Sequence, residues 1–152
     1  MTELFLDRYR DKGLEATLDA LMAIEERAFA DPWRREMMVS SFSCGNVRLF
    51  TAEEEGRVLG YLFLMEIPPE GEILNLAVDP ACRRRGLGDR LMEAALAYAR
   101  EQGIDTLFLE VRESNLAARG LYQKAGFEAV GKRKRYYRYP TEDAVIMTLT
   151  LS

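Results

Sequence analysis

An apolar segment, an arginine-rich glycine turn and an amphipathic stretch follow one another in the middle of the chain. Residues Ile73 to Val78 are apolar except for one asparagine, and Asp79-Pro80 ends the run. Residues 83–88 then read Arg-Arg-Arg-Gly-Leu-Gly, and apolar residues recur three or four apart as far as Tyr98. This pattern predicts a strand, a basic turn and a helix over 86–102. It therefore directs the chain toward an α/β fold.

The turn over residues 83–88 has the chemistry of an anion-binding site. The first turn of a helix presents backbone N–H groups without partners and about half a positive charge. Glycine lets a ligand approach the backbone, and arginine supplies forked donors that suit a diphosphate. The motif is Arg-x-x-Gly-x-Gly, which is neither a Walker loop nor the three-glycine dinucleotide fingerprint. A solvated loop is the alternative interpretation.

The composition excludes several classes of function. The 152 residues are 48% hydrophobic and 30% charged, which suits one domain over residues 1–152. A net charge of −4 argues against a DNA-binding protein. No apolar stretch approaches membrane-spanning length, and the first residues do not resemble a signal peptide. We therefore expect a cytoplasmic protein without a membrane partner.

The chain contains no histidine. This absence excludes Ser-His-Asp and Cys-His nucleophile systems and histidine-based metal sites. The cysteines Cys44 and Cys82 are too few for a disulfide framework or a zinc site, and we interpret both as structural. No metal is expected. Any proton transfer must use a carboxylate, tyrosine, lysine, thiol or water.

Periodicity and turn residues predict the remaining elements. We expect strands at 3–9, 47–51, 57–67, 72–78, 106–111, 127–137 and 144–151, and helices at 14–29, 33–42, 86–102 and 115–125. Pro32 suits a helix start, Ser114 or Asn115 a helix cap, and Gly126 a helix end. The fourth and fifth strands, joined by one helix, predict a right-handed parallel crossover. The expected fold is a single α/β domain with a mixed, mostly antiparallel sheet, a central parallel βαβ crossover and flanking helices.

This element order and the Arg-x-x-Gly-x-Gly turn resemble the GNAT family of N-acetyltransferases. The segments that resemble its RimI type are Ala28-Phe29-x-x-Pro32-Trp33, residues 75–80, residues 109–115, Leu121-Tyr122 with Gly126-Phe127, and residues 142–147. Enzymes of that type acetylate the N-terminal alanine of a small ribosomal-subunit protein. The resemblance covers nearly the whole chain. It implies the GNAT fold, acetyl-CoA as co-substrate, and a protein or peptide N-terminus, such as that of a ribosomal protein, as substrate.

The resemblance also implies a set of residues that bind acetyl-CoA. Those expected to contact the pantetheine arm are Leu76, Ala77, Val78 and Asn115, with the Val78 N–H supporting the thioester oxygen. Those expected to surround the diphosphate are Arg83, Arg84, Arg85, Gly86, Leu87, Gly88 and Asp89. Asp89 departs from the basic residue that many relatives have after Gly-x-Gly. We interpret its carboxylate as a cap or a complement of the helix N-terminus. Two outcomes are open: the affinity for CoA is lower, or Arg83 and Arg90 compensate for the missing base.

Glu110 and Tyr122 are the candidate catalytic pair. Alternation places Glu110 on the face of strand 106–111 opposite to its leucines, and a carboxylate in so apolar a strand needs water or a partner. A structural ion pair with Arg112 or another arginine is the alternative interpretation for Glu110, and a core position is the alternative for Tyr122. The resemblance implies that Glu110 is the general base, through water, and that Tyr122 is the general acid to the CoA thiolate.

The basic and aromatic run over residues 132–138 has three interpretations. It has features of an RNA-binding strand, since bases stack on aromatic rings beside basic side chains. Lysine and arginine also protect the edge of a sheet from pairing. The resemblance implies a third role, in which Tyr136 and Tyr137 frame the peptide substrate with Trp33 across the groove. The edge and substrate interpretations are favoured over RNA.

Two classes of function remain open from the sequence. The first is an acetyl-CoA-dependent N-terminal protein acetyltransferase, and the second is a non-catalytic module that binds acyl-CoA. Glu110 and Tyr122 favour the enzyme, because a binding module needs neither. Within the enzyme class, the alternative acceptor is a lysine side chain or a small-molecule amine.

Overall fold

The computed structural model describes residues 2–10 and 13–151 and shows, in that part of the chain, one seven-stranded sheet. The strands are β1 (Glu3–Leu6), β2 (Val47–Glu54), β3 (Arg57–Ile67), β4 (Glu70–Val78), β5 (Thr106–Arg112), β6 (Glu128–Arg138) and β7 (Thr141–Thr150). The helices are α1 (Leu18–Ala28), α2 (Arg35–Ser43), α3 (Leu87–Glu101) and α4 (Leu116–Ala125), with short 3-10 turns η1 (Leu14–Ala16) and η2 (Pro80–Cys82). The order across the sheet is β1-β2-β3-β4-β5-β7-β6. The sheet is mixed, with the parallel pair β4–β5 at its centre, which confirms the predicted fold class.

Several predicted boundaries are wrong: the helix predicted at 14–29 is the turn η1 followed by α1, β2 extends to Glu54 rather than residue 51, and β7 begins at Thr141 rather than residue 144. Two further boundaries are shifted by a hydrogen bond to a side chain outside the element. Strand β1 ends at Leu6 rather than residue 9, because Asp7 has a positive φ of 51° and its carboxylate accepts a hydrogen bond from the Leu49 N–H. Helix α2 begins at Arg35 rather than residue 33, because the Trp33 N–H donates to the carboxylate of Glu25. Pro32 therefore lies in the α1–α2 loop.

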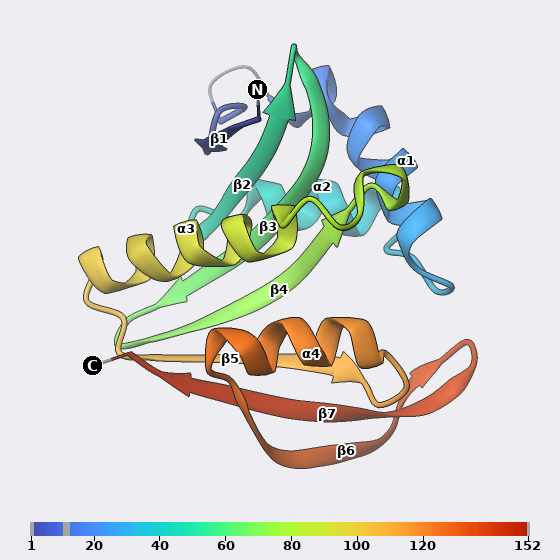
Figure 1. Ribbon diagram of the computed structural model, residues 1–152, viewed down its shortest axis with the longest axis vertical. Helices are drawn as coiled ribbons and strands as arrows, with labels where there is room; N and C mark the ends of the chain where they lie inside the picture. Colours follow the sequence, from blue (N-terminus) through green and yellow to red (C-terminus); the bar gives the residue numbers. More distant parts are fainter. Residues whose placement is uncertain (1, 11–12, 152) are drawn as a thin grey trace.

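Helices cover both faces of the sheet (Figure 1). Helices α3 and α4 lie on one face, where the fully buried leucines include Leu62, Leu64, Leu91, Leu107 and Leu109. Helices α1 and α2 lie on the other face, where the buried side chains include Leu21, Ile24, Met38, Tyr61 and Phe63. Among the described helices, none is both long enough and apolar enough to cross a membrane.

Strands β4 and β5 separate soon after they begin. Their parallel pairing is confined to Glu70–Glu72 against Thr106–Phe108. Beyond this point the strands diverge, as Figure 1 shows, while β4 stays paired to β3 through Val78. One edge of residues 73–78 therefore has no strand partner among the described residues, and its backbone groups need another partner. The divergence opens the centre of the sheet at the carboxyl ends of both parallel strands.

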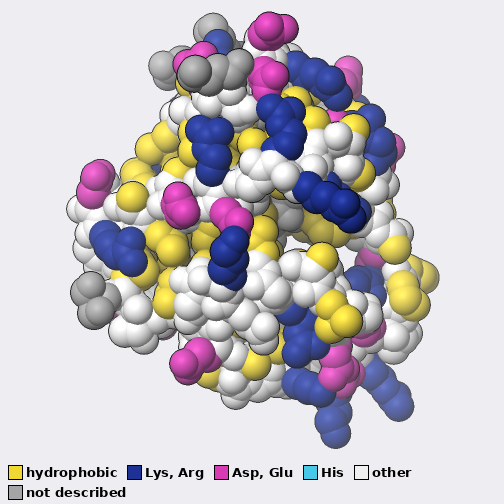
Figure 2. Space-filling model, in the orientation of Figure 1, with side chains coloured by type: hydrophobic (Ala, Val, Ile, Leu, Met, Phe, Trp, Pro, Cys, Tyr) yellow, Lys and Arg dark blue, Asp and Glu magenta, His cyan; other side chains and the backbone are white. Residues whose placement is uncertain are grey.

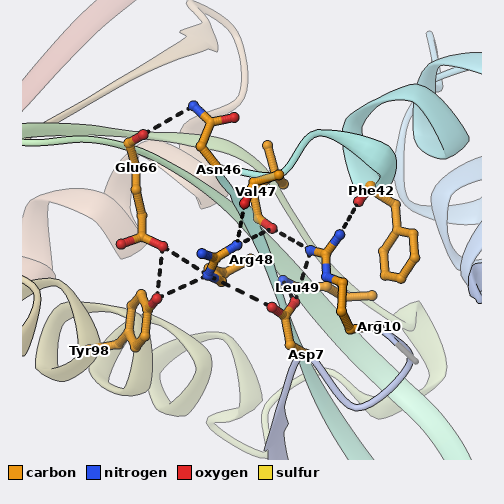
Figure 3. Close-up of polar contacts among 10 residues, drawn as sticks. Asp7, Arg10, Phe42, Asn46, Val47, Arg48, Leu49, Glu66 and Tyr98 are labelled. Carbon is orange, nitrogen blue, oxygen red and sulfur yellow. Dashed lines mark hydrogen bonds and ion pairs between the residues drawn. The ribbon is translucent and has the colours of Figure 1, made fainter. Parts of the chain in front are cut away.

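A polar network fixes the closed end of this opening (Figure 3). Arg48 of β2 donates to the hydroxyl of Tyr98 on α3 at 3.0 Å and pairs with Glu66 of β3 at 2.8 Å. The Tyr98 hydroxyl donates to the same carboxylate at 2.7 Å. Burial, and then the hydrogen bond to Glu66, raise the pKa of Tyr98, so it remains a neutral donor. The network joins α3 to the hairpin of β2 and β3, close to the paired ends of β4 and β5.

Strand β6 is the outer strand at one end of the sheet, and nearly all of it is exposed. This position fits the predicted charged edge, because lysine and arginine side chains discourage further pairing. The pairing with β7 is interrupted between Arg133 and Tyr137, where Arg135 has a positive φ of 54°. The irregularity brings Tyr136 and Tyr137 to the opening in the sheet.

Candidate active site

A cleft of about 800 Å³ occupies the opening between β4 and β5. Its walls come from the α1–α2 loop, β4, β5, the start of α4 and the end of β6. Figure 2 shows the hollow between the upper half of the molecule, with α3, and the lower half, with α4. Of the residues singled out from the sequence, it brings together Trp33, Leu76, Glu110, Asn115, Tyr122, Tyr136 and Tyr137. Residues up to 104 positions apart therefore meet in one cavity.

Glu110 has one anchored carboxylate oxygen and one without a partner. Its Oε1 lies 3.2 Å from Nε of Arg133. Glu110 therefore forms the ion pair with an arginine that the sequence offered as an alternative, but the arginine is Arg133 and not Arg112. Its Oε2 is buried and has no hydrogen-bond partner among the described residues. An unsatisfied buried carboxylate oxygen costs free energy, so natural structures keep one mainly where a ligand or water reaches it. The geometry leaves Oε2 available to accept a proton or a hydrogen bond.

The charge of Glu110 affects the acidity of its neighbours. Burial first, and then the negative charge of Glu110, raise the pKa of Glu72 on β4. The same two causes, in the same order, raise the pKa of Tyr136 and raise that of Tyr137 to about 12. Both tyrosines are therefore neutral at pH 7 and present hydroxyl donors beside the carboxylate.

Tyr122 lines the same cleft from α4. Asn115 caps this helix by accepting a hydrogen bond from the Ala118 N–H at 3.1 Å, and Gly126 ends it with a φ of 111°. The Tyr122 ring is buried edge-to-face against Phe127, and its hydroxyl bonds no described residue. Burial, with a smaller contribution from Tyr137, raises its pKa well above the ordinary value. Tyr122 therefore holds its proton at neutral pH.

The two glycines of the turn before α3 have different structural roles. Gly86 is the N-cap residue with a φ of 70°, and no side chain caps the first N–H groups of the helix. A Cβ at Gly86 would meet no atom within 4 Å, so the space beside this N-cap residue is open. At Gly88 a Cβ would lie 2.5 Å from Cδ1 of Leu121, so this glycine allows α3 and α4 to pack closely. An anion can thus reach the helix N-terminus at Gly86.

The charged side chains around this turn are not equivalent. Arg85 pairs with Glu54 of β2, whereas Arg83 and Arg84 are exposed and form no ion pair with any described residue. The carboxylate of Asp89 lies 3.0 Å from Nζ of Lys124 and ties α3 to α4. Asp89 does not cap the helix, but it lies in its first turn, where a negative charge complements the helix N-terminus. Arg83 and Arg84 remain available to an anion at the helix N-terminus.

The open edge of β4 completes the cleft. Val78 pairs with Gly60 and Ala77 with Tyr61, but no described strand pairs with the opposite edge of this segment. Asn115 uses its side-chain oxygen to cap α4, which leaves its amide N–H groups as donors. An extended ligand with amide groups can bond this edge as an added strand would, and an anionic end would reach the N-terminus of α3. These features fit the pantetheine arm and diphosphate of coenzyme A.

Sequence reasoning missed a buried carboxylate beside the cleft. Glu25 of α1 is 2% exposed and accepts hydrogen bonds from the Tyr61 hydroxyl, from Asn75 at 2.7 Å and from the Trp33 N–H at 2.8 Å. Its one sequence signal is its place four residues after Leu21, on the apolar face of the helix. Glu25 fixes the position of the α1–α2 loop.

The fold and cleft define an acyl-CoA-dependent transferase, and residues 18–127 match the model of the acetyltransferase (GNAT) family. The chain belongs to this family. It is 38% identical over 145 residues to the [ribosomal protein bS18]-alanine N-acetyltransferase of Escherichia coli K12, covering 92% of this chain and 96% of that protein. The crystal structure of the ribosomal-protein-S18-alanine N-acetyltransferase from Escherichia coli superposes with a TM-score of 0.87 at 33% identity, covering 100% and 95% of the two chains.

A third comparison shows that the fold is shared with a more distant protein. The fold matches that of a GNAT acetyltransferase from Elizabethkingia anophelis with acetyl-CoA bound, with a TM-score of 0.79 at 20% identity, over 99% of this chain and 98% of that one. The family match and the similarity to the Escherichia coli enzyme make the protein an acetyl-CoA-dependent N-acetyltransferase. Within residues 2–10 and 13–151, no cluster of three or more histidine, cysteine, aspartate or glutamate side chains is arranged to hold a metal ion.

We expect a Gly86→Val substitution to weaken acetyl-CoA binding about tenfold or more. The side chain would project into the open space before α3, and losing a charge-assisted hydrogen bond costs about 1.5–3 kcal/mol. Isothermal titration calorimetry with acetyl-CoA measures the change. Gly103→Val is the matched control, because Gly103 follows the other end of α3, also has a positive φ of 77° and also faces open space. An unchanged acetyl-CoA affinity in Gly86→Val would show that the diphosphate does not bind at this turn.

Proposed function

We propose that the enzyme transfers the acetyl group of acetyl-CoA to the N-terminal α-amino group of a protein, with an N-terminal alanine of a ribosomal protein as the acceptor. The observation that carries this proposal is the cleft itself, where the half-satisfied carboxylate of Glu110 lies between aromatic walls on two sides. The activity named for the similar proteins of Escherichia coli supports the same acceptor.

The proposed chemistry is a direct attack of the amine on the thioester. Glu110 accepts a proton from the substrate ammonium through a water molecule, because its Oε2 is the unpartnered acceptor in the cleft. The neutral nitrogen forms a bond to the carbonyl carbon, and the Val78 N–H stabilises the charge on the carbonyl oxygen. As the carbon–sulfur bond breaks, Tyr122 donates its proton to the leaving sulfur. As the amide forms, the nitrogen loses its second proton to water, which returns a proton to Tyr122, and Glu110 releases the first proton to the solvent.

The walls of the cleft suit an extended peptide. Trp33 packs on Phe63 with ring centroids 5.5 Å apart, and its backbone is held by Glu25. On the other side, Tyr136 and Tyr137 pack edge-to-face at 5.1 Å. Aromatic rings that are packed on one side lose little entropy when a ligand covers the other. The restricted space favours a small first residue such as alanine.

We expect the enzyme to acetylate α-amino groups much faster than lysine side chains. Only a neutral amine attacks, and the pKa of an α-amino group is near 8 compared with about 10.4 for lysine. This difference of about 2.5 units corresponds to roughly 3 kcal/mol at neutral pH. A single carboxylate acting through water is a modest base, so it suits the more acidic ammonium. Rates should rise with pH until the α-amine is neutral.

Mass spectrometry on a pair of matched peptides tests this selectivity. One peptide begins with a free alanine and contains no lysine, and the other has the same sequence with a blocked N-terminus and one internal lysine. A panel that varies the first residue then measures how strictly alanine is required. Equal or faster acetylation of the blocked peptide would favour a lysine or small-amine acceptor instead.

A further inference from the structure

One guanidinium, that of Arg112, connects the segments that form the mouth of the cleft. It ends β5 and is 17% exposed. It donates to the backbone oxygens of Tyr139 at 3.3 Å and Pro140 at 2.9 Å, and it lies 4.3 Å from the ring centroid of Tyr137. It also pairs with Glu142 of β7 at 3.2 Å. Arg112 therefore fixes the end of β6 and the turn into β7.

The same guanidinium reaches across the cleft to the α1–α2 loop. Its Nη2 lies 3.0 Å from Oδ2 of Asp31. Among the hydrogen bonds and ion pairs of residues 2–10 and 13–151, this pair is the one that joins the loop to the strands beyond the cleft. The loop is otherwise held on its own side, by Glu25 and by the packing of Trp33 on Phe63. Figure 1 shows the α1–α2 loop and the β6–β7 turn at the same open end of the molecule.

We propose that the Asp31–Arg112 ion pair is a latch that positions the α1–α2 loop over the bound peptide. As far as it concerns the peptide, this inference rests on the proposed function. Arg112 follows Glu110 by two residues on the same strand face, about 7 Å farther out. An extended peptide whose amino group lies at Glu110 therefore has its second or third residue beside the latch. Asp31 and Arg112 are positioning residues, because they act on the peptide through the walls they connect.

The exposure of the pair suits a latch that opens. Asp31 is 35% exposed, so water can replace its partner when a peptide enters or leaves. Arg112 keeps its bonds to Pro140 and Glu142 without Asp31, so opening the latch frees the loop and leaves the β6–β7 turn in place. Only one wall of the cleft would therefore move.

The kinetic test is the variant Asp31→Asn, which keeps the shape of the side chain and removes its charge. We expect the KM for an alanine peptide to rise about two- to fivefold, the effect of losing one partly exposed ion pair. The kcat and the KM for acetyl-CoA should stay at the wild-type values. Asp19→Asn is the matched control, because Asp19 pairs with Arg35 on the exposed side of α1 and α2, away from the cleft. An unchanged peptide KM in Asp31→Asn would overturn the latch.

Trp33 gives a second measurement that needs no substrate. It is the single tryptophan of the chain and lies in the loop that the latch holds. We expect acrylamide to quench its fluorescence more strongly in Asp31→Asn than in the wild type or in Asp19→Asn. Equal quenching in all three proteins would overturn the latch. A third outcome separates the two proposals. If acrylamide quenches Trp33 fluorescence less in the wild type than in Asp31→Asn, but the wild type does not acetylate the alanine peptide, the latch is supported and the proposed function is wrong.

A double-mutant cycle with Arg112→Gln separates the latch from the other bonds of Arg112. In the Arg112→Gln background, adding Asp31→Asn should change neither the peptide KM nor the quenching, because the partner is already gone. If the effects of the two substitutions are additive, Asp31 does not act through Arg112, and the proposal is overturned. Thermal melting of each variant identifies any loss of folding, and Asp31→Asn alone still decides the question if Arg112→Gln does not fold.

Discussion

Replacing Glu110 by glutamine is expected to lower kcat by about 10²–10⁴-fold, the range typical of losing a positioned general base. Glutamine has nearly the same shape and keeps an oxygen that Arg133 can bond, but it cannot accept the proton of the substrate ammonium. The acetyl-CoA affinity should be nearly unchanged, because the cofactor is expected on the β4 and α3 side of the cleft. Stopped-flow or steady-state kinetics with an alanine peptide, together with calorimetry, measure both quantities.

The control for Glu110→Gln is Glu113→Gln. Glu113 follows β5 and pairs with Lys132 of β6, much as Glu110 pairs with Arg133, but it does not line the cleft. Its loss should leave kcat unchanged. If Glu110→Gln keeps the wild-type turnover, Glu110 has only a structural role, in which its carboxylate holds Arg133 and β6.

The strand, glycine turn and helix unit could be predicted from the sequence because its determinants are local. Strand β4, Gly86 and the apolar stripe of α3 follow one another directly in the chain, and each has a conformational preference of its own. The same holds for Asn115 as the cap of α4 and Gly126 as its end. The alternation in β5 correctly placed Glu110 away from the buried leucines, because the period of a strand is two residues.

The cleft could not be predicted in the same way, because it depends on where pairing stops. Nothing in the sequence of β4 shows that its pairing with β5 ends at Glu72. The partners of the site residues are also distant in sequence: Asp31 lies 81 residues before Arg112, and Glu25 lies 50 before Asn75. The structural alternative for Glu110 predicted a pair with Arg112 or another arginine, and the partner is Arg133 of β6, which lies 23 residues after Glu110.

The divergence of β4 and β5 also explains how one site can combine separate tasks. The β4 edge and the α3 N-terminus suit the cofactor, and the facing residues of β5 and α4 suit proton transfer. The α1–α2 loop and the end of β6 lie at the mouth, where a peptide would enter. A sheet paired along its full length would bury the β4 edge and bring no such groups together. The function proposed here thus depends on a short ladder of backbone pairing at one end of the two strands.

Tyr122→Phe is expected to lower kcat by about 10²–10⁴-fold with little change in acetyl-CoA affinity. The hydroxyl bonds no described residue, so its removal should cost little stability, and the lost rate would report a chemical role. Because burial raises the pKa of Tyr122 above its ordinary value of 10.0, the proton is present at neutral and mildly alkaline pH. The wild-type rate should therefore rise with the ionisation of the amine near pH 8 and show no decline from Tyr122 below about pH 10.

The control for Tyr122→Phe is Tyr98→Phe. Tyr98 also has a raised pKa, but its hydroxyl bonds Glu66 and Arg48 at the closed end of the sheet (Figure 3). Its loss should lower the melting temperature and leave kcat unchanged, which is the opposite of the result expected for Tyr122. A fall in melting temperature without a fall in kcat for Tyr122→Phe would make Tyr122 a core residue. The leaving sulfur would then take its proton from water, since the chain has no histidine to supply one.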